Sequence, residues 1–325
     1  MSTIWAREKL ASAIVVLAFL VGGCGGSPMV ATPIPSPTPP TFTTSTKPGT
    51  YFIGAGDVGE CSLPGAGITA GIIEKLRPFS RSPDGSDPRV PVPGDLAYPN
   101  GSETDFRDCF VPHWGRFKLF MIAALGNHEY NLPGRPYFFT YFGDEVAGHD
   151  GYQSYVFGRW LVLVLNSERR GAAQIEFMRD ELATHPESYV LAIWHRPRWS
   201  SSRNGDSTYV QEFWNELRGR QAVILNGHDH VYERMYPLGV DGKRDDGGIR
   251  QFTVGTGGGP LYEFKTENIR TEISEFRYSD PDGVVREYGV IRLRLAGDGY
   301  EWEYWVSQAG KVDPVMVDQG LETFR

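Results

Sequence analysis

The sequence predicts an α/β protein whose functional groups lie at one edge of a β-sheet. Apolar, strand-like runs alternate with segments of helical spacing through residues 50–325, and short polar strings directly follow several of these runs. A hydrophobic content of 40% with eight tryptophans supplies ample core. Parallel strands present their carboxyl ends at the same edge, so we expect an open α/β sheet with its site there.

The expected elements follow from periodicity, taken in chain order. An alternating run and an apolar run flank Gly158-Arg159, which indicates a hairpin over 152–165. Other strands are expected at 51–53, 90–93, 119–125, 189–194, 222–225, 252–254, 285–295 and 299–306, and helices at 68–79, 171–184 and 208–219.

One expected strand conflicts with its own composition. Residues 90–93 read Val-Pro-Val-Pro, and the two prolines remove backbone donors from any sheet ladder. We therefore expect a short or irregular strand before Asp95.

The N-terminus has the pattern of an export signal. Arg7 and Lys9 precede the apolar run 10–21, which is too short for a bilayer span of roughly 20 residues. The following Val-Gly-Gly-Cys resembles a bacterial lipobox, which implies a lipoprotein-type signal peptide over 1–23 and lipidation of Cys24. An ordinary cleaved signal with an incidental Cys24 is the alternative.

The regions after the signal differ sharply in composition. Residues 24–49 are rich in Pro, Thr and Ser and are expected to be an extended linker, with a single folded domain over 50–325. We expect an exported protein, anchored by lipid at a bacterial cell surface or periplasmic membrane, or else secreted. A net charge of −8 argues against binding to a nucleic-acid backbone.

Five short strings carry the candidate chemistry. Each follows a strand-like run, and together they supply carboxylate, phenol, amide and imidazole groups without any cysteine. Such donors suit two hard or borderline metal ions rather than a structural zinc site. Each string alone has an ordinary structural explanation, but their order and placement together favour a two-metal site. The candidate ligands are Asp57, Asp95, Tyr98, Asn127, His195, His228 and His230.

Over residues 51–230 the strings resemble those of the calcineurin-like metallophosphoesterases. The common first motif of that superfamily is Asp-x-His, whereas here Gly59 stands at the third position and Tyr98 follows Asp95 by three residues. This exchange of an imidazole for a phenol is similar to the purple acid phosphatase branch. The resemblance implies a β-sandwich flanked by helices, with a dimetal site at the strand ends.

The resemblance also implies how the two ions are shared. One set of ligands would bind ferric iron, because a phenol with a pKa of about 10 needs a strong Lewis acid to bind as phenolate. The other set would bind a divalent ion: zinc, manganese or iron. The first set is Asp57, Tyr98 and His230, the second is Asn127, His195 and His228, and Asp95 is the bridging carboxylate.

By the same resemblance the activity is hydrolysis of phosphate monoesters with a metal-activated hydroxide as nucleophile. His128 would contact the phosphate of a small ester substrate and protonate the leaving group. The stretch 196–203 lacks the histidines that plant and animal enzymes carry there, so Arg196 or Arg203 would bind phosphate instead, or both would be surface arginines. Glu129 and Asp229 would orient ligands or simply stabilise their loops.

Two alternatives stay open. A phosphodiesterase or nucleotidase would use the same centre, with residues 131–150 and 261–284 walling a cleft of unknown width. A non-catalytic, lipid-tethered surface binding protein would need none of the chemistry.

The three cysteines complete the prediction. With Cys24 assigned to lipidation, Cys61 and Cys109 remain, and each follows a ligand of one implied metal, Asp57 or Asp95. The two loops should therefore begin as neighbours, and an exported compartment permits a Cys61–Cys109 disulfide.

Overall fold

The computed structural model describes residues 45–264 and 269–324. The expected signal peptide, the lipidation site Cys24 and the linker up to residue 44 lie outside this part. The linker was expected to extend to residue 49, but Ser45 already contacts the folded domain. Its Oγ donates to Asp298 Oδ1 at 2.6 Å, and its backbone N–H donates to Glu301 Oε1 at 2.6 Å. The domain boundary therefore lies at least five residues earlier, because these polar contacts fix the chain ahead of the first strand.

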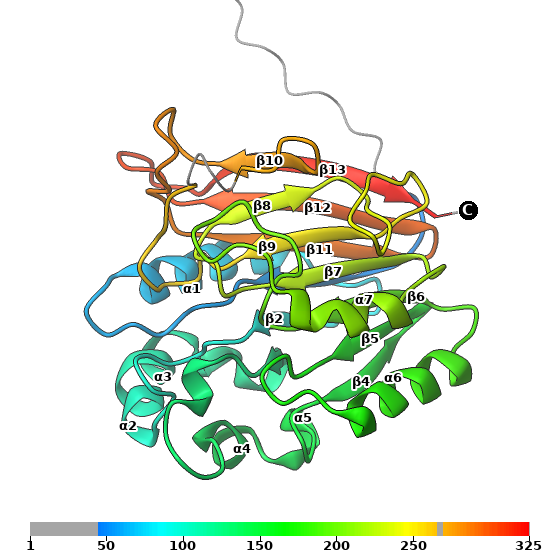
Figure 1. The fold of residues 1–325 in the computed structure, drawn as a ribbon. Coiled ribbons are helices and arrows are strands. Elements are labelled where there is room, and N and C mark those ends of the chain that lie inside the picture. Colours follow the sequence, from blue (N-terminus) through cyan, green and yellow to red (C-terminus); the bar gives the residue numbers. More distant parts are fainter. Residues whose placement is uncertain (1–44, 265–268, 325) are drawn as a thin grey trace, which may run out of the picture. The chain divides into compact units, whose positions relative to one another are not determined.

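The described residues form three sheets (Figure 1). A four-stranded antiparallel sheet has the order β1-β11-β12-β13, a mixed seven-stranded sheet has the order β10-β8-β9-β7-β6-β5-β4, and β2 pairs with β3. The strands are β1 (Gly49–Gly54), β2 (Val90–Pro93), β3 (Met121–Ala124), β4 (Gln153–Phe157), β5 (Trp160–Val164), β6 (Tyr189–Ile193), β7 (Ala222–Asn226), β8 (Tyr232–Met235), β9 (Arg250–Val254), β10 (Ser274–Tyr278), β11 (Gly289–Ala296), β12 (Gly299–Val306) and β13 (Val315–Thr323).

The two larger sheets pack face to face, as a β-sandwich does. Alternate residues of β12 point into the interface, where Trp302 packs on Phe252 of β9 with ring centroids 5.6 Å apart. Tyr304, two residues further along the same face, stacks on Tyr232 of β8 at 3.7 Å. The predicted sandwich is therefore confirmed, and it arises because both sheets have one apolar face to bury.

Helices cover the outer face of the seven-stranded sheet (Figure 1). In β5 the inner residues Trp160 and Val162 join the sandwich core, while Leu161 and Leu163 point outward and pack with α6 and α7. Because successive side chains of a strand face opposite ways, one apolar run contributes both to the core between the two sheets and to the core between the seven-stranded sheet and its helices. The helices are α1 (Gly65–Leu76), α2 (Glu103–Asp105), α3 (Val111–Trp114), α4 (Tyr137–Phe142), α5 (Asp144–Ala147), α6 (Ala172–Thr184) and α7 (Gln211–Glu216), with short 3-10 or π segments η1 (Arg77–Phe79), η2 (Phe106–Phe110), η3 (Gly115–Phe120), η4 (His128–Tyr130) and η5 (Thr208–Val210).

The proline-containing strand β2 is short and lies between β1 and β3. It pairs in parallel with β3 over all four residues, but it joins β1 through a single bridge between Phe52 and Arg89. Arg89 N–H donates to Tyr51 of β1 at 2.8 Å. Pro91 and Pro93 follow at alternate positions and so face the same side, where their missing donors end the ladder. The expected irregularity is thus confined to one side of the strand.

Several boundaries differ from those the sequence predicts. The first helix spans Gly65–Leu76 rather than 68–79, and the segment expected over 208–219 is a 3-10 turn followed by the short helix α7. The strand expected from residue 119 begins at Met121, because Leu119 belongs to η3 and is 87% exposed. Strands β8, β10 and β13 were not predicted, since charged residues interrupt their apolar pattern.

Within residues 45–264 and 269–324, no helix combines the length and the apolar character needed to cross a membrane.

Candidate metal centre

The five motif strings meet at one edge of the fold. They follow β1, β2, β3, β6 and β7 directly, and each of these strands runs parallel to its neighbour in the series β1–β2–β3 or β6–β7. The loops after β1 and β2 continue side by side, because Asp57 N–H donates to Gly94 and Val58 N–H donates to Asp95. The seven candidate ligands therefore all lie at this edge.

One group of donors surrounds the phenol of Tyr98. Its Oη lies 3.0 Å from Asp57 Oδ1 and 3.1 Å from His230 Nε2. His230 Nε2 in turn lies 3.2 Å from Asp57 Oδ1. The three atoms that would bind the first metal are therefore mutual neighbours.

A second group surrounds His195. Its Nε2 lies 3.2 Å from Asn127 Oδ1 and 3.2 Å from Asp95 Oδ2. One ligand atom each of Asp95, His195 and His228 lies within 4.8 Å of the others, and the rings of the two histidines are 5.0 Å apart. These are the residues that would bind the second metal.

Asp95 belongs to both groups. Its Oδ2 lies 3.3 Å from Tyr98 Oη in the first group and 3.2 Å from His195 Nε2 in the second. A carboxylate between two donor sets is placed as a bridge between two ions would be.

The backbone is strained where these ligands lie. Among the described residues, the non-glycine residues with positive φ are Asp57 at 61°, Asp95 at 50° and His228 at 69°. Non-glycine residues seldom adopt this left-handed conformation, and it costs about 1–3 kcal/mol where the surrounding structure enforces it. All three strained positions are candidate ligands, which is typical of a functional site.

The donor set fits metal ions on chemical grounds. Among the described residues, no lysine or arginine forms an ion pair with Asp57 or Asp95, although both carboxylates are buried. Neighbouring donor atoms lie 3.0–3.2 Å apart, and carboxylate, phenol, amide and imidazole groups are those that hard and borderline ions would bind. Burial, followed by the charges of Asp57 and Asp95, raises the pKa of Tyr98 well above its usual value. A phenolate therefore requires an added cation at this position.

Two of the candidate histidines, His195 and His230, present one nitrogen to the centre and bind a carbonyl with the other. His195 Nδ1 donates to Pro93 O at 2.9 Å, and His230 Nδ1 donates to Pro260 O at 2.6 Å. The carbonyls fix the tautomer, so each Nε2 keeps its lone pair toward the centre. In the metal-free protein burial opposes protonation, but Asp95 outweighs it and raises the pKa of His195 to about 10.

Glu129 holds the loop that carries Asp95. Its buried carboxylate accepts hydrogen bonds from the backbone N–H groups of Asp95 at 3.0 Å, Leu96 at 2.8 Å and Gly126 at 2.7 Å. Burial, and then the charge of Asp95, raises the pKa of Glu129. Gly126 must be glycine, because a Cβ there would overlap the Asp95 carboxylate. Glu129, which was expected to orient ligands, therefore does so by binding backbone N–H groups of their loops.

Asp229 has a different role. Its carboxylate accepts a hydrogen bond from Ser200 Oγ at 2.5 Å and another from Asn204 N–H at 3.3 Å. It therefore stabilises the loop after β6, which is the second of the two roles that the sequence suggested for Asp229.

His128 lies beside the candidate ligands with its Nε2 toward the centre. Its Nδ1 donates to Pro99 O at 2.6 Å, and its Nε2 lies 3.8 Å from Asp95 Oδ2. The ring packs against Tyr98 with centroids 4.4 Å apart. The free Nε2 is thus placed to meet a group bound at the centre.

Arg196 already forms hydrogen bonds with two other side chains. Its Nε donates to Glu168 at 2.9 Å and its Nη1 donates to His228 Nε2 at 2.8 Å. Burial, and then the positive charges of His195 and Arg196, lowers the pKa of His228 well below its usual value. The guanidinium therefore lies at the centre, where it holds a candidate ligand in the neutral form.

The sequence did not identify Tyr262 or Glu168, which contact residues of the centre. The ring of Tyr262 stacks on His230 with centroids 4.2 Å apart and planes 7° apart, and Arg203 lies 3.9 Å above the other face of Tyr262. Glu168 binds Arg196. No local motif marks Tyr262 or Glu168, because each reaches the centre from a loop remote in sequence.

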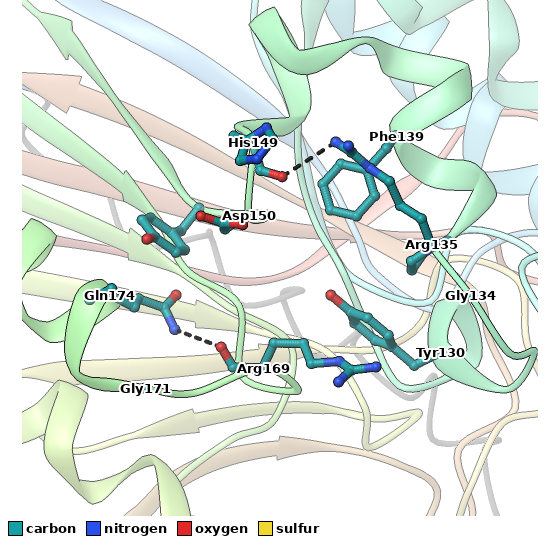
Figure 2. Close-up of a pocket in the computed structure, with 12 residues that line it drawn as sticks. Tyr130, Gly134, Arg135, Phe139, His149, Asp150, Arg169, Gly171 and Gln174 are labelled. Carbon is teal, nitrogen blue, oxygen red and sulfur yellow. Dashed lines mark hydrogen bonds between the residues drawn. The ribbon is translucent and has the colours of Figure 1, made fainter.

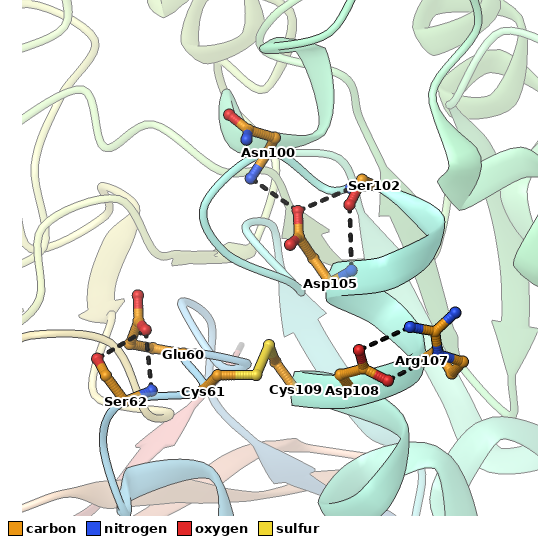
Figure 3. The surroundings of a disulfide bond; sticks show 9 residues. All are labelled: Glu60, Cys61, Ser62, Asn100, Ser102, Asp105, Arg107, Asp108 and Cys109. Atoms are coloured by element: carbon orange, nitrogen blue, oxygen red, sulfur yellow. Dashed lines mark hydrogen bonds and ion pairs between the residues drawn. A yellow bond between two sulfur atoms is a disulfide. The ribbon is translucent and has the colours of Figure 1, made fainter.

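A disulfide ties two of the loops together (Figure 3). Cys61 and Cys109 form the bond, with Cα atoms 4.6 Å apart, between the loop after β1 and the helical segment η2. This is the pair that the sequence favours. The capping box at Ser102 and Asp105 starts the helical run that carries Cys109.

Comparison with known proteins places the fold. No family model matches the chain. The purple acid phosphatase from yellow lupin (Lupinus luteus) seeds superposes over 82% of this chain and 53% of its own with a TM-score of 0.57 and 20% identity. PhoD superposes over 84% of this chain and 69% of its own with a TM-score of 0.56 and 12% identity. The fold is therefore that of the calcineurin-like metallophosphoesterases, to which both belong, and the predicted resemblance is confirmed at this level.

Two further matches limit what the fold implies. An acid phosphatase of Aspergillus ficuum is 33% identical over 87 residues, which cover 25% of this chain and 14% of that protein. GAP50, described as the anchor in the inner membrane complex of Plasmodium, superposes over 86% of this chain and 90% of its own with a TM-score of 0.58 and 12% identity. This chain spans about half the length of the lupin phosphatase.

Proposed function

We propose that this protein is a dinuclear metallophosphoesterase that hydrolyses phosphate monoesters. The observation that carries the proposal is the position of the Asp95 carboxylate between two complete donor groups. Neither group contains a lysine or an arginine, and three of the converging residues adopt a strained backbone. The phosphatases among the similar proteins support the same chemistry.

The residues divide into two metal sites. The first contains the phenol, which favours ferric iron, and the second contains an amide and imidazoles, which suit zinc, manganese or ferrous iron. Asp57, Tyr98 and His230 would hold the first ion, Asn127, His195 and His228 the second, and Asp95 both. Two bound ions would supply an activated nucleophile and neutralise the charge of the phosphate.

His128 is the residue proposed to act on the substrate. Its Nδ1 is committed to Pro99 O, so its Nε2 is the atom that would meet the ester. When protonated, this nitrogen donates to a phosphate oxygen and then passes its proton to the departing alkoxide. Arg196 lies on the opposite flank, where Glu168 restrains its guanidinium and limits its approach to the phosphate.

A binding protein without catalysis is the competing function, because GAP50 is described as an anchor and shares the fold. The complete donor set argues against this alternative here. A protein that only binds has no use for buried carboxylates that lack a lysine or arginine partner, or for an imidazole nitrogen held beside them.

Export is proposed on separate grounds. The Cys61–Cys109 disulfide supports an oxidising compartment, and the sequence of residues 1–24 supports a lipid anchor.

The test is metal analysis combined with turnover. Protein purified without chelator should contain two metal ions per chain and hydrolyse phenyl phosphate faster than diphenyl phosphate. Chelation should remove both the metal and the activity, and added metal should restore them. A protein with two bound ions and no turnover on either ester would leave the binding function standing, and preference for the diester would favour a phosphodiesterase.

A further inference from the structure

A cavity of about 440 Å³ lies beside the metal centre, at the end of β5 (Figure 2). Its walls come from η4, from the segment 134–152 and from the start of α6. Strand β5 lies next to β6, which carries His195, so the cavity opens one strand away from the candidate ligands along the same edge. Ligands of α/β proteins bind at such carboxyl edges.

Two contacts join the cavity to the centre. Tyr130 lines the cavity and belongs to the same short turn as His128. Arg169 also lines it, and the preceding residue Glu168 holds Arg196 against His228. The cavity is therefore linked through Tyr130 to the turn of the proposed proton donor, and through Arg169, Glu168 and Arg196 to His228, although none of the seven ligand candidates lines it.

The cavity presents flat cationic surfaces. The guanidinium of Arg169 lies 4.8 Å from the ring centroid of Tyr130, and that of Arg135 lies 4.2 Å from the ring centroid of Phe139. Figure 2 shows these two pairs on neighbouring walls of the pocket. A guanidinium over one ring can also stack with a second planar ring.

The cavity also has a free acceptor. Arg135 is already paired with Asp144 at 2.7 Å. The carboxylate of Asp150 lies across the pocket and, among the described residues, has no arginine or lysine partner. A sugar hydroxyl would therefore find an acceptor opposite the arginines.

We infer that this cavity binds the leaving group of the substrate, and that the leaving group is a nucleoside. A planar base would stack on Arg169, and the ribose hydroxyls would donate to Asp150 while the phosphate lies at the metal centre. The volume lies within the range of about 300–1,000 Å³ that small-ligand sites have. This inference rests on the proposed monoesterase function and specifies its substrate class as nucleoside 5′-monophosphates.

The test compares two esters that have the same reacting group. Adenosine 5′-monophosphate and ribose 5-phosphate both release a primary ribose alcohol and carry the same phosphate, so only the base distinguishes them. We expect kcat/KM to be about tenfold higher for the nucleotide, which corresponds to one stacking contact with a cation.

Arg169→Lys isolates the stacking surface, because it keeps the charge and removes the planar guanidinium. This variant should reduce the preference for the nucleotide to about twofold. Arg170→Lys is the matched control, since Arg170 is the adjacent residue but lies over Tyr209 at 4.6 Å and does not line the cavity. The control should keep the preference of the unmodified protein.

Calorimetric binding of adenosine separates this inference from the proposed function. Adenosine should bind the unmodified protein and the Arg170→Lys variant, and about tenfold more weakly the Arg169→Lys variant, with or without hydrolysis of any ester. Equal kcat/KM for the two esters together with no adenosine binding would overturn the nucleoside pocket and leave the phosphatase intact. Adenosine binding by a protein that hydrolyses neither ester would overturn the phosphatase and leave the pocket intact.

Discussion

Two buried polar clusters in this protein are built on opposite principles. Between β8 and β13, Asp318 receives two hydrogen bonds from Arg234, at 2.9 and 3.0 Å, and one from Tyr232 at 2.7 Å. At the strand ends, Asp57 and Asp95 face a phenol, an amide and imidazoles, and no guanidinium pairs with either. The first cluster contains an arginine as counterion, whereas the second contains neither an arginine nor a lysine that pairs with its carboxylates.

The two clusters also differ in backbone conformation. Asp318 and Arg234 lie on regular strands, whereas Asp57, Asp95 and His228 lie in left-handed turns. A fold tolerates buried carboxylates without a lysine or arginine partner, and strained turns, only where function demands them. The comparison teaches that the counterion content of a buried cluster, rather than its burial, separates a structural network from a metal site.

The largest expected effect follows from Asp95→Asn. The amide cannot bridge two cations, so phosphatase activity should fall by at least about 10³-fold and bound metal should be lost. Metal content and turnover of phenyl phosphate measure this. His228→Ala should lose metal and activity in the same way, and retention of both ions by either variant would contradict the ligand assignment.

Asp318→Asn should have the converse phenotype. It removes one of the two carboxylates that pair with the buried Arg234 guanidinium and leaves Glu275 as the other, so the free energy of unfolding in urea should fall by about 1.5–3 kcal/mol. Metal content and kcat of the folded fraction should be unchanged. A loss of metal in this variant would erase the distinction between the two clusters.

His128→Ala tests the side chain that lies at the centre but outside both donor groups. Loss of a general acid lowers kcat by about 10²-fold or more, while both ions remain bound. Metal loss equal to that of Asp95→Asn would assign His128 to the ligands instead.

Metal removal should destabilise only the cluster that lacks an arginine or lysine counterion. At a hundredfold excess of metal over its Kd, binding stabilises the native state by about 2.7 kcal/mol. The Asp318→Asn variant should gain the same increment from added metal, because the clusters are separate and their contributions add. Asp95→Asn should gain much less, which thermal unfolding with and without chelator will show.

The smallest change in stability is expected for Tyr98→Phe, which removes a single hydroxyl. If the phenolate binds ferric iron, the purified protein should be purple to pink, and this variant should lose the visible absorption band while keeping its fold. A fully metallated, active protein without iron or visible absorption would assign two divalent ions to the centre.

The sequence predicts the inner strands and the strand-end motifs well. The runs before Asp57, His195 and His228 are purely apolar, so their periodicity identifies them as buried strands, and polar residues after such strands have few other places to lie. The family resemblance adds the sandwich, which periodicity alone does not distinguish from an open sheet.

The rest depends on tertiary contacts that no local pattern reveals. Strand β8 contains Glu233 and Arg234, which look solvent-exposed in sequence but are buried because Ser201, Ser274 and Asp318 satisfy them. Tyr262 reaches His230 from a loop that carries no motif. Such residues are recognisable only once the fold brings their partners together.

The pairing of β1 fixes when this centre can exist during biosynthesis. The strand that positions Asp57 hydrogen-bonds along its whole length to β11, residues 289–296, and meets β2 through a single bridge. A nascent chain that has emerged only as far as His230 therefore holds every candidate ligand, but the strand before Asp57 has only its bridge to β2. We expect metal binding to begin only after β11 has paired with β1, so the compartment in which the chain completes folding would decide which metals it receives.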